Sequence, residues 1–301
     1  MSVLLQTDLS FPLFRRGKVR DVYDLGDKLL IVSTDRISAF DFVLPCGIPD
    51  KGKVLNQISA FWFQKTAHLV PNHLIKAIDS AAAFNELGES LAYSRQLPDY
   101  LSGRSMIVAK AERIPIECVV RGYLSGSAWA EYKKTGIVSY MRLPPEMKES
   151  QELAQPIFTP TTKSETEHDR LLTDKDIESL GVEELIAELE QKSLLIYRYA
   201  QDYAKAKGII IADTKFEFGL INGGLVVIDE LLTPDSSRFW DASQYEAGHS
   251  QPSFDKQPVR DWLTASGWNK EPPVPMLPPE VIEATTQRYN KIYRLFTGKS
   301  I

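Results

Sequence analysis

The sequence predicts an α+β fold in which an antiparallel N-terminal lobe packs on a larger α/β lobe. Strand-like runs joined by turn signals occupy the first part of the chain, whereas most helical patterns follow residue 174. This order, strands first and helices later, is typical of α+β proteins. A chain of 301 residues is also long enough for two lobes with a substantial core. We therefore expect an N-terminal lobe at residues 1–114 and a larger lobe at residues 115–301.

Composition narrows the class of protein. The net charge of −5 gives no support for nucleic acid or an anionic membrane as the main partner. No apolar run approaches the length of a transmembrane helix, and the N-terminus lacks a signal-peptide core. Cys46 and Cys118 stand among apolar neighbours, which is typical of buried thiols in a reduced compartment. We expect a cytoplasmic protein and, in the absence of any other signal, a monomer.

In the N-terminal lobe, turn and periodicity signals define the elements. Gly26-Asp27 is a strong hairpin signal between two strands, and apolar residues at helical spacing predict a helix over 54–69. Residues 77–103 have little pattern and indicate a surface excursion. The predicted strands are 17–24, 28–35, 105–112 and 115–121.

The larger lobe is predicted to contain more helix. Gly136 ends the first of its helices and Gly181 divides another pair. Residues 142–172 are polar, carry four prolines and are expected to form a long connection without secondary structure, which in a compact domain is usually functional. The predicted helices are 125–134, two within 174–207, 255–265 and 279–296.

The stretch 208–240 is the strongest candidate for a functional element. Ile209, Ile210 and Ile211 begin a buried strand, after which charged and apolar residues alternate. Side chains two apart in a strand share a face, so one face carries the charges and the other carries Thr214, Phe216 and Phe218. Charges on so apolar a strand are costly unless something binds there. The charged set is Asp213, Lys215 and Glu217.

The turn that follows decides where Asp229 lies. A two-residue Asn222-Gly223 loop would pair Glu217 with Ile228 and place Asp229 on the opposite face. A three-residue loop, with Gly224 in the left-handed position, would pair Glu217 directly with Asp229, and this is the arrangement we expect. Two opposed carboxylates repel unless a cation lies between them, and Mg²⁺ suits such oxygen ligands. The alternative is a solvated edge hairpin with unpaired acids.

Two basic motifs are candidate anion sites. Gly17-Lys18 begins the first predicted strand, where the glycine would let phosphate approach the backbone, although Lys18 alone also fits a surface lysine. Arg121, Ser125 and Ser127 combine an arginine with the start of a helix, which favours a phosphate. An ordinary serine cap beside a solvated arginine fits this motif equally well. Arg238 follows the hairpin and would strengthen a phosphate site.

Other residue types give weaker signals. Lys163 and the pair His168-Asp169 stand in the long polar connection and, taken alone, fit solvated loop groups. The sequence has no zinc-type cluster, no dinucleotide or Walker fingerprint and no Gly-x-Ser-x-Gly motif. The residues themselves therefore suggest an ATP and Mg²⁺ site beside a second anion site.

Seven sequence blocks, in order along the chain, span most of residues 15–265. The blocks are GKVRDVY, STDRISAFD, VVRGYLSGSAW, FTPTTKSETEHD, ADTKFEFG, IDELLTPDSSRFW and SFDKQPVRDWL. In content and order they resemble the signatures of the phosphoribosylaminoimidazole-succinocarboxamide synthase (SAICAR synthetase) family, in its longer form.

The resemblance implies a ligase of purine biosynthesis with a kinase-like or ATP-grasp-like nucleotide cleft between its lobes. ATP, L-aspartate and 5-amino-1-(5-phosphoribosyl)imidazole-4-carboxylate (CAIR) would give SAICAR, ADP and phosphate through an acyl phosphate. The resemblance assigns no site to 77–103 or to the tail after 268. The implied roles are Gly17 and Lys18 for ATP, Glu217 and Asp229 for Mg²⁺ and the nucleotide, Asp213 and Lys215 for catalysis, Arg121, Ser127 and Arg238 for the ribonucleotide phosphate, and Lys163 and Asp169 at the substrate site.

Two other functions remain open from the residues. A small-molecule kinase would use the same metal hairpin but would release a stable phosphorylated product. A non-catalytic nucleotide sensor would bind ATP without turnover. Release of ADP that depends on both the ribonucleotide and aspartate would distinguish the ligase from both.

Overall fold

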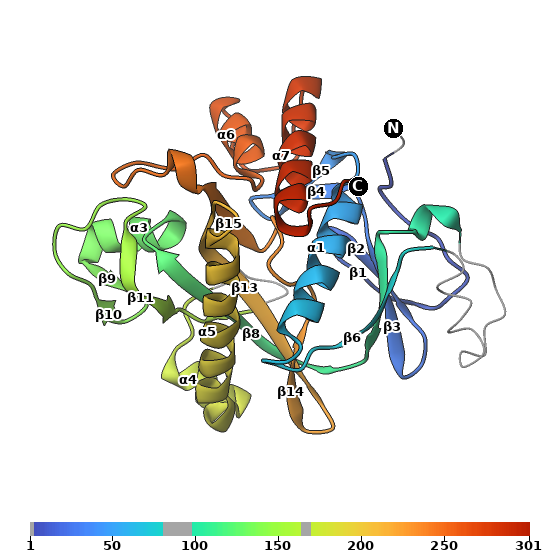
Figure 1. The fold of residues 1–301 in the computed structure, drawn as a ribbon, viewed down its shortest axis with the longest axis horizontal. Coiled ribbons are helices and arrows are strands. Elements are labelled where there is room, and N and C mark those ends of the chain that lie inside the picture. Colours follow the sequence, from blue (N-terminus) through green and yellow to red (C-terminus); the bar gives the residue numbers. More distant parts are fainter. Residues whose placement is uncertain (1–2, 81–97, 164–169) are drawn as a thin grey trace.

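Antiparallel strands from the first third of the chain form one sheet of the molecule (Figure 1). The structure is a computed structural model and describes residues 3–80, 98–163 and 170–301. Gly26 has a positive φ in the turn between the second and third strands, and the predicted hairpin is confirmed. In sheet order, the strands are β1 (Leu13–Arg16), β2 (Arg20–Asp24), β3 (Lys28–Ser33), β7 (Ser105–Ala109) and β6 (Leu74–Ile78).

The first predicted strand, 17–24, begins three residues later in the structure, at Arg20. Gly17, Lys18 and Val19 form a turn between β1 and β2, closed by a 2.8 Å hydrogen bond from Gly17 N to Arg20 O. The chain therefore reverses at Gly17-Lys18. The surface excursion predicted at 77–103 falls mostly on residues 81–97, which lie outside the described residues.

A second antiparallel sheet has six strands and is centred on β8 and β13. Residues 152–158 and 161–162 belong to it, so the prediction of a connection without secondary structure at 142–172 was wrong. The physical reason is that β11 is an edge strand, which tolerates Pro156 and the exposed polar side chains of Glu152 and Gln155. The strands are β11 (Glu152–Phe158), β8 (Glu112–Tyr123), β13 (Ile209–Ile221) and β14 (Gly224–Ile228), with β12 (Thr161–Thr162) on β8 and β15 (Ser237–Asp241) on β13.

The hairpin between β13 and β14 has a two-residue loop, so the expected three-residue loop was wrong. Ile221 pairs with Gly224, and Glu217 pairs with Ile228. Asn222 and Gly223 both have positive φ values, 52° and 76°, which is the requirement of the tight hairpin turns that match strand twist. Gly224 is consequently the first residue of β14 and not part of the turn.

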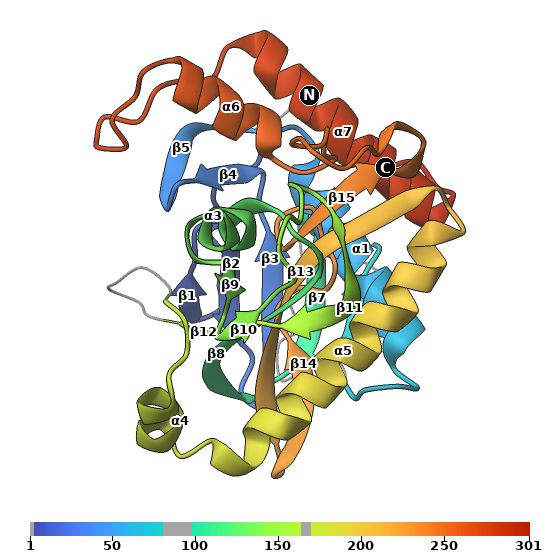
Figure 2. The ribbon, with the colours of Figure 1, turned by 90° about the vertical axis from the view of Figure 1, so that its left-hand side faces the viewer.

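The helices cover the two sheets in the predicted order (Figures 1 and 2). α1 packs on β3, β6 and β7, whereas α5 lies across β8, β11 and β13, and α7 packs on α1 and α6. Gly181 is left-handed between α4 and α5, as its predicted role as a break requires. The helices are α1 (Lys51–Thr66), α3 (Gly126–Thr135), α4 (Asp174–Leu180), α5 (Glu183–Lys205), α6 (Gln257–Ala265) and α7 (Pro279–Thr297).

Small elements complete the fold, and no described helix combines the length and apolar composition needed to span a bilayer. Cys46 and Cys118 are buried free thiols, as predicted. Among the described residues, the remaining strands pair as two short hairpins, and two 3-10 turns occur. These elements are β4 (Arg36–Ala39) with β5 (Phe42–Gly47), β9 (Ile137–Val138) with β10 (Met141–Arg142), η1 (Asp99–Leu101) and η2 (Ala242–Gln244).

One hydrophobic core joins both sheets. It contains Val108 of the first sheet, Phe216 of the second, and the ring pair of Trp62 in α1 and Phe296 in α7 at 5.3 Å. The segment 71–73 links the sheets through its backbone. His73 N donates to Val227 O at 3.0 Å, and Ala109 N donates to His73 O at 2.8 Å. The two sheets are thus held in a defined relation around the cavity described next.

Candidate active site

The central strand β13 carries charges on one face and core residues on the other, as its alternation predicts. Phe216 and Phe218 are fully buried in the main core. Lys215 and Glu217, on the opposite face, line a cavity of about 1270 Å³. Neighbouring side chains on one face of a strand are separated by about 6.5 Å, twice the rise per residue. The face therefore sets fixed spacings among Asp213, Lys215 and Glu217.

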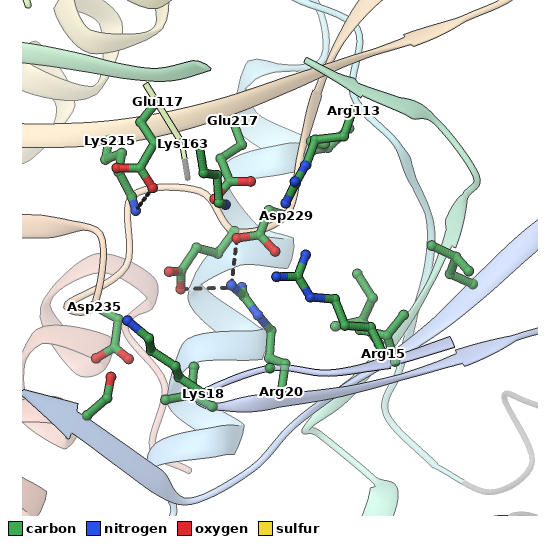
Figure 3. A pocket seen from close by; sticks show the side chains of 18 of the residues that line it. Arg15, Lys18, Arg20, Arg113, Glu117, Lys163, Lys215, Glu217, Asp229 and Asp235 are labelled. Carbon is green, nitrogen blue, oxygen red and sulfur yellow. Dashed lines mark hydrogen bonds and ion pairs between the residues drawn. The ribbon is translucent and has the colours of Figure 1, made fainter. Parts of the chain in front are cut away.

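Residues of both sheets line this cavity (Figure 3). Val22, Leu29 and Ile31, from β2 and β3, form an apolar wall. Gly17 and Lys18 reach it from the turn between β1 and β2. The exposed Lys18 ammonium forms an ion pair with Asp41 at 2.5 Å. The cavity thus combines an apolar surface with a cationic rim, an arrangement suited to a nucleotide.

Four acidic side chains gather where β8, β13 and the end of β14 meet, and we call them the carboxylate cluster: Glu117, Glu217, Asp229 and Glu230. Glu117 and Glu217 are directly opposed on β8 and β13. Lys163 contacts Glu217 and Lys215 contacts Glu117, so each of these carboxylates has its own lysine (Figure 3). Burial opposes the charged form of Lys215, but Glu117 and Glu217 outweigh it and raise the pKa of this lysine. The charged form of Lys215 is therefore favoured.

Asp229 reaches the cluster by a route that strand parity does not predict. It follows the last residue of β14 and has a φ of 71°, a left-handed conformation that is rare for residues other than glycine. Burial lowers the pKa of the nearby His73 to about 4, and the charge of Asp229 opposes this change. Arg20 binds the Asp229 carboxylate at 2.5 Å and lies 3.7 Å from Glu230. Asp229 therefore lies near Glu217 even though the two are not paired across the hairpin.

The two central carboxylates have opposite pKa shifts. Burial raises the pKa of Glu217, and the nearby charge of Asp229 raises it further, while Lys163 and Lys215 oppose the change. Burial also acts on Asp229, but Arg20 outweighs it and the pKa of Asp229 is lowered. Like charges held this close in a buried site favour either protonation or an additional cation.

A second cluster, which we call the arginine cluster, lies at the other end of the charged face and consists of Arg121, Arg238, Ser125 and Ser127 around Asp213. Arg121 Nη1 is 3.3 Å from Asp213 Oδ2, and Arg238 contacts the same oxygen. Arg121 Nη2 donates to Ser127 Oγ at 3.2 Å. The expected gathering of Arg121, Ser127 and Arg238 is therefore found, with Asp213 holding the two guanidinium groups.

Backbone shape brings this cluster close to the start of α3. Gly126 has a φ of 57°, and a Cβ atom there would lie 2.6 Å from Arg238 Nη2. Ser125 is the cap residue, but its hydroxyl donates to Asp213 Oδ2 at 3.3 Å and makes no capping hydrogen bond. Two arginines and two serine hydroxyls beside free helix N–H groups form a suitable site for a phosphate.

Of the site residues predicted in the long polar connection, the structure describes only Lys163. Lys163 lines the cavity and contacts Glu217. Asp169, together with His168, lies outside the described residues. Within residues 3–80, 98–163 and 170–301, no group of three or more His, Cys, Asp or Glu residues is arranged to hold a metal ion. The described protein oxygens near Glu217 and Asp229 would therefore supply only part of a coordination shell.

Sequence reasoning missed several residues of the cavity. Arg20 and Glu117 both lie on strands, and their polar side chains inside apolar runs were the available signal. Asp235, which also lines the cavity, had no such signal, because its partner Lys51 comes from a distant segment and the two meet only in the folded chain. The Lys51 side chain is fully buried and its Nζ lies 2.8 Å from Asp235 Oδ2.

Comparison with known proteins is consistent with this geometry. Residues 13–275 match the model of the SAICAR synthetase family. A phosphoribosylaminoimidazole-succinocarboxamide synthase of Thermodesulfovibrio yellowstonii is 51% identical over 299 residues, which cover 99% of each chain. The SAICAR synthase of Saccharomyces cerevisiae, solved in complex with SAICAR, has a TM-score of 0.86 at 42% identity and 99% coverage of each chain. A SAICAR synthetase solved with ADP has a TM-score of 0.69 at 26% identity, with 95% of this chain and 98% of that chain covered.

Proposed function

The chain belongs to the SAICAR synthetase family, and from that membership we propose that it is an ATP-dependent ligase of purine biosynthesis. It would join L-aspartate to the carboxylate of CAIR and form SAICAR, ADP and phosphate. The relative solved with SAICAR and the one solved with ADP support this choice of small-molecule ligands. We also propose that residues 1–114 and 115–301 act as two lobes with a kinase-like or ATP-grasp-like nucleotide cleft between them.

The single observation that carries the proposal is the charged face of β13. Asp213 belongs to the arginine cluster and Glu217 to the carboxylate cluster, and the two are four residues apart on one face. This separation is about 13 Å along a strand. A ribonucleotide anchored by its phosphate at one end would extend its carboxylate toward the other end. Lys215 lies between the two clusters.

The ends of this face would take different substrates. Arg121, Ser127 and Arg238 would bind the 5′-phosphate of the ribonucleotide, with Lys163 and Asp169 bordering the substrate. ATP would occupy the cavity, with its base against the apolar wall and its phosphates near Gly17 and Lys18. In this arrangement Asp213 acts mainly by positioning the two arginines.

Mg²⁺ is the metal that the carboxylate cluster fits best. Glu217 is buried, Asp229 is half-buried, and the two are close and of like charge; burial of Glu217 and the charge of Asp229 raise the pKa of Glu217. Two carboxylates are sufficient because Mg²⁺ normally keeps several waters and takes phosphate oxygens as well. When bound by Glu217 and Asp229, the ion would neutralise charge on the transferring phosphoryl group.

The proposed chemistry has two steps. An oxygen of the CAIR carboxylate attacks the γ-phosphorus of ATP, which forms an acyl phosphate and releases ADP. The amine of aspartate then attacks the acyl carbon, a C–N bond forms, inorganic phosphate leaves with that oxygen and the amine loses a proton. Lys215, whose charged form is favoured by Glu117 and Glu217, would stabilise the negative charge that develops near the acyl group. Holding the reactants together removes much of the entropic barrier.

Release of ADP is the experiment that tests the proposal. Purified protein is incubated with ATP and Mg²⁺, and ADP is measured with the ribonucleotide and aspartate added singly and together. We expect ADP release only when both are present. Release with the ribonucleotide alone would indicate a kinase, and binding of ATP without any release would indicate a sensor.

A further inference from the structure

The turn between β1 and β2 has each of its three backbone carbonyl groups bound by a nearby residue of the protein. Arg36, the first residue of β4, donates from Nε to Lys18 O at 3.0 Å and from Nη2 to Gly17 O at 2.9 Å. Thr34 donates to Val19 O from its backbone N–H at 2.9 Å and from its hydroxyl at 2.8 Å. The carbonyl groups of the turn are therefore directed toward residues 34 and 36.

The direction of the carbonyl groups also fixes the direction of the N–H groups. In a trans peptide, the C=O of one residue and the N–H of the next residue point in opposite directions. The N–H groups of Lys18 and Val19 therefore point away from Arg36, and within the described residues neither donates to a protein acceptor. Gly17, Lys18 and Val19 line the cavity, whereas Arg36 is not one of its lining residues. The two N–H groups are thus available to a ligand in the cavity.

Arg36 is itself held in place from its other side. Its side chain is buried, Nη2 also donates to Asp21 Oδ1 at 2.9 Å, and Nη1 donates to Leu5 O. The Asp21 side chain is fully buried and accepts two further hydrogen bonds from Thr7. A planar guanidinium surrounded by four acceptors is restricted to one orientation. The arginine therefore sets the shape of the turn and does not simply follow it.

This arrangement favours a bound phosphate for two electrostatic reasons. Successive backbone N–H groups that face the same space form a concavity that binds anions. The carbonyl oxygens of Gly17 and Lys18, which would repel a phosphate, are directed to the Arg36 guanidinium instead. The exposed ammonium of Lys18 adds positive charge at the rim of the same cavity.

We propose that Arg36 is a positioning residue of the nucleotide site, which acts from outside the cavity by directing the N–H groups of Lys18 and Val19 toward a phosphate of ATP. This inference rests on the proposed placement of the ATP phosphates near Gly17 and Lys18. In this arrangement Arg36 has no contact with the nucleotide. Its loss should therefore weaken the binding of the phosphates and leave the binding of the base intact.

The test compares Arg36→Met and Arg36→Lys with a matched control, Arg104→Met. Arg104 is also a buried arginine paired with a fully buried acid, Asp35, at 3.0 Å, and its guanidinium binds that acid and not the turn. The Kd values of ADP and of adenosine, which has no phosphate, are measured by calorimetry in the presence of Mg²⁺. All three variants lose a buried guanidinium, but only the Arg36 variants change the support of the turn.

We expect the Kd of ADP to rise about tenfold or more in Arg36→Met, because the N–H groups lose their alignment with the phosphate. The rise should be smaller in Arg36→Lys, since an ammonium keeps a cation beside Asp21 but lacks the fork that binds both carbonyl groups. The Kd of adenosine in each variant, and both Kd values in Arg104→Met, should stay within about twofold of wild type. If Arg36→Met does not fold, Arg36→Lys carries the test.

The amide resonances of Lys18 and Val19 in ¹⁵N-labelled protein give a second, direct readout. In wild type, saturating ADP should shift both resonances, whereas adenosine should leave them nearly unchanged. In the Arg36 variants, the shifts caused by saturating ADP should be much smaller. An arginine that only stabilises the fold would leave these shifts as they are in wild type, and that result would contradict the inference.

The outcomes distinguish this inference from the proposed function. If wild type shows no aspartate-dependent ADP release, the ligase function fails, while the binding measurements still decide the role of Arg36. An equal loss of affinity for ADP and adenosine in the Arg36 variants would overturn that role, because it indicates general damage. An equally large loss of ADP affinity in Arg104→Met would overturn it too. So would unchanged ADP affinity in both Arg36 variants.

Discussion

Glu217 and Asp229 illustrate how two neighbouring carboxylates can differ. Glu217 is buried and Asp229 is half-buried. Asp229 has a direct guanidinium partner in Arg20, whereas Glu217 is paired with Lys163 but also has the charge of Asp229 beside it. The pKa of Asp229 is therefore lowered and that of Glu217 raised. A divalent cation bound by both groups would favour the ionised form of Glu217, so metal affinity should depend on each carboxylate.

Glu217→Gln and Asp229→Asn should each raise the Mg²⁺ concentration needed for half-maximal activity by about tenfold or more and lower kcat. The physical reason is that each variant removes one of the two carboxylate ligands proposed for the metal ion. Activity is measured across a Mg²⁺ titration, with Asp27→Asn, a 77% exposed turn residue, as the control. Near-normal turnover at ordinary Mg²⁺ in either active-site variant would contradict the shared metal site.

Lys215 is central to the proposed order of chemistry. If the carboxylate is phosphorylated first, ribonucleotide labelled with ¹⁸O in that carboxylate should transfer one label to inorganic phosphate in each turnover. Lys215→Met should slow this transfer, since the developing charge loses a cation. Its effect on ATP binding should be modest. Mass spectrometry of the released phosphate gives the result, and unlabelled phosphate from a fully active enzyme would rule out the acyl phosphate.

At the scale of elements, helix α3 links local backbone shape to the ribonucleotide site. Gly126 and Gly136, at its two ends, are both left-handed, with φ values of 57° and 69°. A Cβ atom at Gly126 would meet Arg238 Nη2 at 2.6 Å, whereas a Cβ atom at Gly136 would have nothing within 4 Å. The two glycines therefore share the backbone strain of substitution and differ only in the contact with Arg238.

Gly126→Ala and Gly136→Ala should each destabilise the protein by about 1–2 kcal/mol, measured by urea unfolding. Only Gly126→Ala should raise the KM for ribonucleotide, because the new methyl displaces Arg238.

Arg238→Ala should raise the KM for ribonucleotide by at least about tenfold, with little change in the KM for ATP or aspartate. If Arg238→Ala moved only the KM for ATP, the two anion sites would have to be exchanged.

The sequence predicted the elements better than their ends. Alternation along β13 placed Lys215 and Glu217 opposite Phe216 correctly, because side-chain direction follows from local geometry. The position of Asp229 was predicted for the wrong reason, since the loop has two residues and a left-handed φ redirects the chain after β14. Contacts between distant segments, such as the ion pair of Lys51 and Asp235, cannot be predicted from a local sequence pattern.

At the scale of the whole molecule, the N-terminal segment is attached through a buried charge. The Asp21 side chain is fully buried and accepts hydrogen bonds from Thr7 N and Thr7 Oγ1, each at 2.8 Å, and from Arg36 Nη2 at 2.9 Å. Burial alone would raise the pKa of Asp21, but these hydrogen bonds outweigh it and the pKa is lowered from 3.8. The ionised form therefore stabilises the folded chain.

The sign of the pH dependence follows from this shift. A carboxyl group with a lowered pKa binds its proton more weakly when folded, so its stabilisation is complete above the unfolded pKa. It is lost as the pH falls from 3.8 through the lower folded value. Asp21→Asn should reduce the free energy of unfolding at neutral pH, and its difference from wild type should shrink below pH 3.8. Denaturant titrations from pH 6 to pH 3 measure this, and a constant difference would contradict it.

The charged face of β13 also bears on how this chain can change over time. Substitutions along the strand alter one side chain each, but a one-residue insertion or deletion within Ile209–Thr214 would turn every following side chain to the other face. Lys215 and Glu217 would then point into the core and Phe216 into the cavity. We therefore expect lineages of this protein to vary freely in residue identity at many positions and to keep the length of this stretch constant.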